Sequence, residues 1–219
     1  MSVHLQHQIE KLKGHIAALG AKVERSLLLA MVCVERRDAA LAGQVIDDDE
    51  AIDRMEVDIE EECLHTLALY QPVAADLRFV VSVLKINNEL ERIADLAGNI
   101  AKQGRFLASE PQMDSPPFDL TGMGDRVRDM LGRALKAMLE GDADLAEHVR
   151  QADDDVDAQH RQMYERVEGA MRAHPDRIPT LIHYMTISRL LERVADQTVN
   201  IAEDVIYTAQ GKLVRHGRE

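Results

Sequence analysis

Residues 91–101 read ERIADLAGNIA, and residues 192–202 read ERVADQTVNIA. The two stretches match in most positions at an offset of 101 residues. A second pair, DAALA at residues 38–42 and DADLA at residues 142–146, matches at an offset of 104. Self-similarity of this kind marks a repeated structural unit. The chain therefore contains two copies of one unit, and the three-residue difference is expected in a turn within the unit, where changes of length are tolerated.

The spacing of apolar residues predicts that each unit consists of three helices. Apolar side chains recur every three or four positions from Leu5 to Val34, a pattern typical of a helix of about nine turns. The pattern continues from Leu41 to Tyr70, and Pro72 ends the helix because it cannot donate the next backbone hydrogen bond. A third helix is expected over residues 73–107.

The predicted fold is all-α: two tandem, pseudo-symmetric three-helix bundles. Pro111, Pro116 and Pro117 lie in a polar stretch between the two copies, where prolines indicate a linker. We therefore expect a first domain over residues 1–108, a linker over residues 109–119, and a second domain over residues 120–219.

Composition excludes several classes of protein. Aromatic residues make up 3% of the chain and there is no Trp, which argues against an all-β fold. The formal net charge is −13, so nucleic acid is not an expected partner. The longest apolar run, Leu27 to Val34, is far shorter than the roughly 20 residues of a membrane span, so no membrane insertion is expected. With no secretory signal in the first residues, the cytoplasm is the expected location.

Acidic residues recur at helical spacing in both copies. Asp49 and Asp53 lie 23 and 19 residues before Pro72, and Glu91 and Asp95 lie 19 and 23 residues after it. Equal counts place residues at equal height in an antiparallel helix pair. Four carboxylates are thus expected together in the first copy, and four more in the second: Asp153, Asp157, Glu192 and Asp196.

Carboxylates at this density suit a cation such as magnesium, manganese or iron, because the cation offsets their mutual repulsion. Glu56 and His160 can add ligands one turn further along. The alternative is a solvated acidic face neutralised by neighbouring arginines. Di-iron carboxylate bundles carry two Glu-x-x-His pairs, whereas here we find one, Glu62 with His65. No familiar catalytic motif is found, and the chain is not expected to be an enzyme.

Four polar residues next to the acidic positions are further candidates. Asn99 and Asn200 are modest helix formers in mid-helix, where they can either add neutral oxygen ligands or form hydrogen bonds across helices. Arg92 and Arg193 can pair with the carboxylates. The same four residues are candidates for contacts with a partner protein.

In these motifs the sequence resembles the PhoU family of phosphate-transport regulators. The resemblance rests on the twin segments 91–95 and 192–196, on the Asp-x-x-x-Asp pairs at 49/53 and 153/157, and on the stretch from Glu61 to Arg78, and it covers essentially the whole chain. The second copy departs from the first at the turn, where PDRIP (residues 175–179) stands in place of AADLR (residues 74–78). Any role of Asp76 or Arg78 is therefore not expected in the second copy.

The resemblance implies a cytosolic adaptor between the ATPase subunit of a phosphate ABC importer and a sensor histidine kinase. Such a protein restrains phosphate uptake and the starvation response. The resemblance also implies bound iron or zinc at the acidic motifs and a homodimer. The alternative function is a metal-storage bundle or a metal-dependent phosphoesterase.

Overall fold

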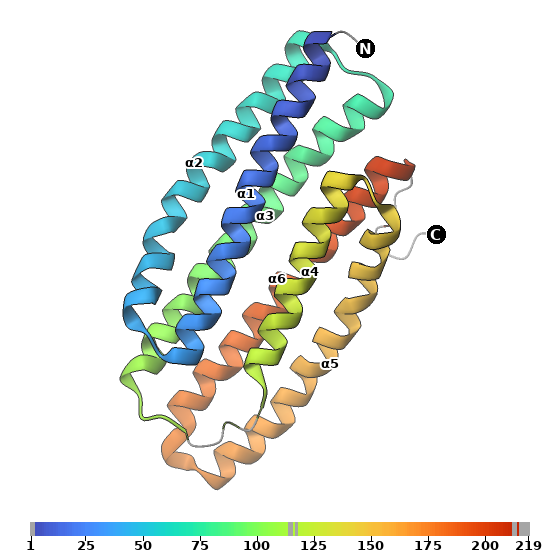
Figure 1. Cartoon of the computed structure of the whole chain (residues 1–219). Helices are drawn as coiled ribbons and strands as arrows, with labels where there is room; N and C mark the ends of the chain where they lie inside the picture. The colour runs from blue at the N-terminus through green and yellow to red at the C-terminus, as the bar shows by residue number, and fades with distance from the viewer. Residues whose placement is uncertain (1–2, 114–115, 117, 212–213, 215–219) are drawn as a thin grey trace.

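The structure is a computed structural model that describes residues 3–113, 116, 118–211 and 214. The described residues form six α-helices, one short 3₁₀ turn (η1, Pro175–Arg177) and no strand (Figure 1). The helices are α1 (Val3–Arg36), α2 (Ala39–Tyr70), α3 (Ala74–Ser109), α4 (Leu120–Glu140), α5 (Ala143–Ala173) and α6 (Ile178–Gln210). The predicted all-α fold with two tandem three-helix bundles is confirmed.

The connection between the bundles coincides with the proline-containing stretch. Helix α3 ends at Ser109 and α4 begins at Leu120. Residues 114, 115 and 117 of the expected linker lie outside the described residues, as do residues 1, 2, 212, 213 and 215–219 of the two expected domains. The domain boundaries stay a prediction.

Each bundle begins its second helix in the same way. The Oδ1 atom of Asp38 accepts hydrogen bonds from the backbone N–H groups of Ala40 and Leu41, at 2.9 and 3.1 Å. Oδ1 of Asp142 likewise accepts from the backbone N–H groups of Asp144 and Leu145 in the first turn of α5, at 3.1 and 2.9 Å. Such a cap satisfies N–H groups that have no partner within the helix. The repeated DAALA and DADLA stretches are thus the N-termini of α2 and α5.

The turn between α2 and α3 has an unusual backbone. Helix α2 ends at Tyr70, two residues before Pro72, and Gln71 follows with a φ of 45°. Ala74, the first residue of α3, has a φ of 49°. Positive φ is uncommon for residues with a side chain. This end of the first bundle also exposes apolar side chains, namely Leu69, Val73 and Leu77.

The two bundles lie side by side, with α3 of the first against α6 of the second (Figure 1). Contacts along this seam pair Ser82 with Thr208 and Glu89 with Asn200, so α3 and α6 run antiparallel. The buried apolar side chains of all six helices form one continuous cluster. The side chains that the sequence places on one face of α3, Ile86, Ile93, Ala97 and Ile100, lie in it.

The seam also contains an ion pair between a buried aspartate and a partly exposed lysine. The side chain of Asp204 on α6 is 2% exposed, and its Oδ1 lies 3.2 Å from Nζ of Lys85 on α3. The same ammonium lies over the ring of Tyr207, 5.5 Å from its centroid. A buried carboxylate needs a partner, and this contact agrees in register with the Ser82–Thr208 and Glu89–Asn200 contacts.

Candidate functional site

The first acidic cluster joins α2 and α3. Asp49 on α2 repels Asp53 and Asp95, and Glu91 on α3 repels Asp95, Asp53 and Glu56. Partial burial, and then this repulsion, raises the pKa of Asp49 and of Glu91 above their ordinary values. The structure thus brings together the four side chains that the sequence places at equal height, and it adds Glu56 to them.

The second acidic cluster is the counterpart on α5 and α6. Burial is the largest cause that raises the pKa of Asp153 to about 6, followed by repulsion from Asp196, Asp157, Asp154 and Glu192. Burial and the neighbouring carboxylates also raise the pKa of Glu192 and of Asp196. The Oδ1 atom of Asp153 is buried and has no hydrogen-bond partner. The second cluster therefore concentrates negative charge around a buried carboxylate oxygen of Asp153.

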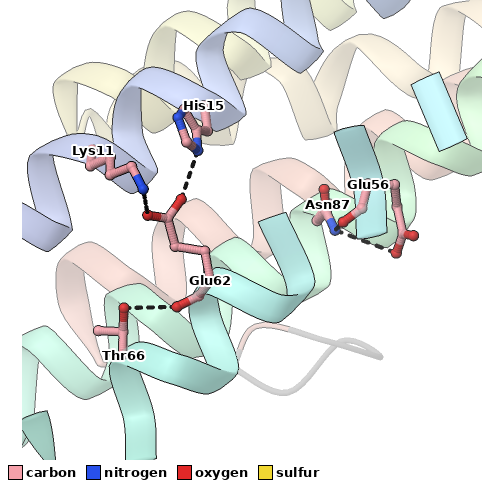
Figure 2. A network of polar contacts seen from close by, with 6 residues as sticks. All are labelled: Lys11, His15, Glu56, Glu62, Thr66 and Asn87. Atoms are coloured by element: carbon pink, nitrogen blue, oxygen red, sulfur yellow. Dashed lines mark hydrogen bonds and ion pairs between the residues drawn. The ribbon is translucent and has the colours of Figure 1, made fainter. Parts of the chain in front are cut away.

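A polar contact next to each cluster holds its two helices together. Asn87 on α3 donates from Nδ2 to the backbone oxygen of Glu56 at 2.9 Å and to its Oε1 at 3.4 Å (Figure 2). In the second bundle, Nδ1 of His160 lies 2.8 Å from Oγ of Ser188. Glu56 and His160 are equivalent in the repeat, as are Asn87 and Ser188. Both contacts thus join the same two positions of the unit.

The remaining candidates lie on the seam between the two clusters. Arg92, Asn99 and Arg193 line a pocket of about 230 Å³ together with Asp95 of the first cluster. Asn200 donates to Oε2 of Glu89 across the seam at 3.5 Å, whereas Asn99 accepts from Lys102 of its own helix at 3.1 Å. Of the two expected roles for these asparagines, Asn200 takes the cross-helix hydrogen bond.

Arginine pairs directly with one member of the second cluster: Nη1 of Arg161 lies 3.4 Å from Oδ2 of Asp157, one turn away on α5. Nη1 of Arg92 lies 3.7 Å from Oε1 of Glu89, which is outside the cluster. The charge of Arg92 lowers the pKa of Glu91, and that of Arg193 lowers the pKa of Glu192 and Asp196, but burial and carboxylate repulsion outweigh them. The alternative of a solvated acidic face with neighbouring arginines thus stays a prediction beside the metal site.

The carboxylates do not form a closed ligand set in their present rotamers. Among the described residues, no three carboxylate, imidazole or thiol groups converge closely enough to hold a metal ion. Their chemistry fits a hard cation, and the partnerless Oδ1 of Asp153 is a donor of the right kind. A cation would require these half-exposed side chains to rotate toward one another.

Glu62, of the single Glu-x-x-His pair, takes part in a different network. Its two carboxylate oxygens lie 2.5 Å from Nζ of Lys11 and 2.7 Å from Nδ1 of His15, both on α1, and its backbone oxygen accepts from Oγ1 of Thr66 at 2.8 Å (Figure 2). This carboxylate joins α1 to α2, and both of its oxygens have side-chain partners on α1.

Sequence reasoning missed the roles of Asn87 and Ser188. Both are buried polar residues at the same position of the repeat. The only sequence signal is a polar residue that interrupts an apolar helical face at the same place in both copies.

Comparison with known proteins identifies both units. The model of the PhoU domain matches residues 16–104 and 120–205. A phosphate-specific transport system accessory protein PhoU homolog from Pseudomonas putida is 36% identical over 216 residues, covering 99% of this chain and 84% of that protein. Its counterpart from Aquifex aeolicus is 33% identical, covering 95% and 94%.

Two crystal structures share the fold. PhoU from Pseudomonas aeruginosa superposes with a TM-score of 0.91 at 34% identity, covering 94% of this chain and 99% of that one. The phosphate transport system regulatory protein PhoU from Streptococcus pneumoniae gives 0.87 at 30% identity, covering 96% and 99%. Because the sequence match, the repeat and the fold agree over both bundles, the chain belongs to the PhoU family.

Proposed function

We propose that this protein is a regulatory accessory protein of phosphate transport. The observation that carries the proposal is the match to the PhoU family over both bundles, with relatives at 33–36% identity that are named as phosphate-specific transport accessory proteins. The two acidic clusters that mark the family resemblance lie on equivalent helix pairs, α2 with α3 in the first unit and α5 with α6 in the second. The function is therefore assigned to binding and regulation rather than to turnover.

In the finer form of the proposal, the protein works in the cytoplasm as a homodimeric adaptor. It contacts the ATPase subunit of a phosphate ABC importer and a sensor histidine kinase, and it restrains uptake and the starvation response when phosphate is plentiful. Exposed apolar side chains at the α2–α3 turn support a docking role, because such groups gain free energy when a partner covers them. Among the described helices none is long and apolar enough to cross a membrane.

We further propose that the acidic clusters bind Fe, Zn, Mg or Mn. A bound cation offsets the carboxylate repulsion that, after burial, raises the pKa of Asp153 and of Glu91. Residues of the first cluster (Asp49, Asp53, Glu91, Asp95) and of the second (Asp153, Asp157, Glu192, Asp196) would hold it. Oxygen ligands alone favour magnesium, manganese or iron over zinc.

Metal binding is tested with purified, chelator-treated protein. Adding Mn²⁺ at about 100 times its dissociation constant is expected to raise the free energy of unfolding by about 2.7 kcal/mol per site. The variant with Glu91→Gln, Asp95→Asn, Glu192→Gln and Asp196→Asn is expected to lose the increase while keeping its helical circular dichroism. An equal increase in parent and variant would show that Mn²⁺ binds elsewhere.

The regulatory role is tested with a phosphate-starvation reporter in phosphate-rich medium. We expect deletion to raise the reporter, the parent gene to lower it again, and the four-residue variant to fail to lower it. The matched control neutralises four exposed acids outside the clusters: Asp47, Asp58, Glu61 and Glu165. This control should restore repression, and a deletion without effect on the reporter would refute the regulatory assignment.

A further inference from the structure

A groove lies between α1 of the first bundle and α4 of the second. The two helices lie together on one side of the molecule, in front of α3 and α6 in Figure 1. The groove has a volume of about 530 Å³. It contains none of the residues of the two acidic clusters, nor the seam residues between them.

The lining of the groove carries a net positive charge, opposite in sign to that of the whole chain. Its charged lining consists of Glu24, Arg25, Arg128, Asp129, Arg133 and Lys136. Four of these side chains are cationic and two are anionic, which leaves a net charge of +2 in a chain whose net charge is −13. Because Arg25 comes from α1 and the other three cations from α4, the charge is assembled only when the two bundles are packed together.

Half of the cations have no carboxylate partner. Arg133 pairs with Asp129, Nη2 to Oδ2 at 2.6 Å, and Arg128 lies 3.5 Å from Asp125 outside the groove. Arg25 and Lys136 are exposed and form no ion pair with another described residue. Two unpaired cations facing one groove repel each other unless an anion lies between them.

Two glycines let the walls of the groove, α1 and α4, pack closely against each other. A Cβ atom at Gly20 would lie 2.7 Å from Cδ2 of Leu135, and one at Gly124 would lie 2.5 Å from Cε of Met31. The helices therefore touch closely at both ends of the groove. Between these points, Gly132 lines the groove without a side chain, and a Cβ atom there would lie 3.5 Å from Oε1 of Glu24.

We propose that this groove binds a multivalent phosphate anion, either orthophosphate or a short linear oligophosphate. The net charge of +2 complements a dianion, and arginine donors match phosphate oxygens in pairs. The groove offers no aromatic side chain on which a nucleotide base could stack. The inference is independent of the proposed regulatory role, since it concerns binding by the purified chain alone.

The test is equilibrium dialysis of the full chain against labelled orthophosphate, pyrophosphate and tripolyphosphate, at constant ionic strength. We expect saturable binding at one site per chain. The double variant Arg25→Gln/Lys136→Gln should weaken it about tenfold or more, as loss of charge-assisted hydrogen bonds does. Tripolyphosphate binding more tightly than orthophosphate would identify a chain ligand, and the reverse would identify the single ion.

Two further variants separate the groove from overall charge. Arg36→Gln/Arg105→Gln removes the same charge from exposed positions outside the groove and should change the affinity less than twofold. Asp129→Asn frees Arg133 and should tighten binding. No saturable binding of any of the three anions up to about 10 mM, or equal weakening in both double variants, would overturn the proposal.

Discussion

Burial and neighbouring carboxylates make the charged form of Asp153 unfavourable in the folded state. Replacing this side chain with a neutral one should therefore stabilise the fold. Folding raises the pKa of this carboxyl from an ordinary 3.8 to about 6, so the folded state binds the proton more tightly than the unfolded state. The resulting stabilisation is complete below pH 4 and is lost as the pH rises through 6. In metal-free buffer at pH 7.5, Asp153→Asn should raise the free energy of unfolding by about 1 kcal/mol, discounted for solvent screening.

Urea unfolding at pH 7.5 and at pH 3.5 checks this prediction. The gain from Asp153→Asn should be present at the higher pH and absent at the lower one. Asp58→Asn, the same change at an exposed position of α2, should leave the free energy of unfolding nearly unchanged at both. A gain of equal size at both pH values would show that it does not arise from the charge.

The grouping of the acidic residues could be predicted from the sequence because it depends only on helical rise and on one turn. Residue counts from Pro72 relate Asp49 to Asp95 and Asp53 to Glu91, and these are the pairs that repel each other in the structure. The hydrogen bond from Asn87 to Glu56 could not be predicted. It depends on how far α3 is rotated about its axis, which a repeat of residue types does not determine.

The close contact between α1 and α3 makes two glycines of α3 differ in their response to alanine. A Cβ atom at Gly104 would lie 2.6 Å from Sγ of Cys33 and 3.3 Å from the backbone nitrogen of Val34, whereas one at Gly98 would meet nothing within 4 Å. Gly104→Ala should lower the free energy of unfolding by about 1–3 kcal/mol through overpacking. Gly98→Ala should raise it by about 0.5–1 kcal/mol, because alanine favours the helix.

Thermal unfolding of the two variants side by side checks this pair of predictions. Both changes add one methyl group to the same helix, so propensity alone would shift the two melting temperatures in the same direction. Opposite shifts identify the close approach of α1 to α3 at Gly104.

The seam between α3 and α6 should be sensitive to loss of one charge. Lys85→Met keeps the length of the side chain but leaves Asp204 without its ammonium partner. Because the carboxylate of Asp204 is buried, losing the ammonium is costly, and we expect a loss of about 1–3 kcal/mol. Arg105→Met, which removes one positive charge at an exposed position of the same helix, is the control and should change the free energy of unfolding by less than about 0.5 kcal/mol.

The pairing of α3 with α6 is the part of the fold that helical periodicity did not reveal. Periodicity identifies one buried face of a helix. On α3 it identifies the face of Ile86, Ile93, Ala97 and Ile100, all of which lie in the core. Ser82, Asn87 and Gly98 are also buried in α3, because this helix is covered by α1, α2 and α6 together. Small and polar residues on the remaining faces are poor signals of burial, so the contact between the bundles required the structure.

The continuous core predicts that the two bundles unfold together. Apolar side chains of all six helices belong to one cluster, and the Lys85–Asp204 ion pair crosses between the bundles. Separating them would expose both. Hydrogen exchange measured by mass spectrometry across a urea series should therefore show peptides of α1–α3 and of α4–α6 losing protection at the same midpoint. Two midpoints, one for each bundle, would show that the halves are independent.

The repeat joins two nearly equivalent units in a single polypeptide, and this has a consequence for variation. A protein assembled from two identical three-helix subunits would carry every substitution twice, once on each side of its axis. Here a change on one side leaves the other untouched. Glu56 and His160, which occupy equivalent positions beside the two clusters, show the result: one carries a carboxylate and the other an imidazole. Covalent fusion thus allows the two halves to diverge toward different ligands while they share one interior.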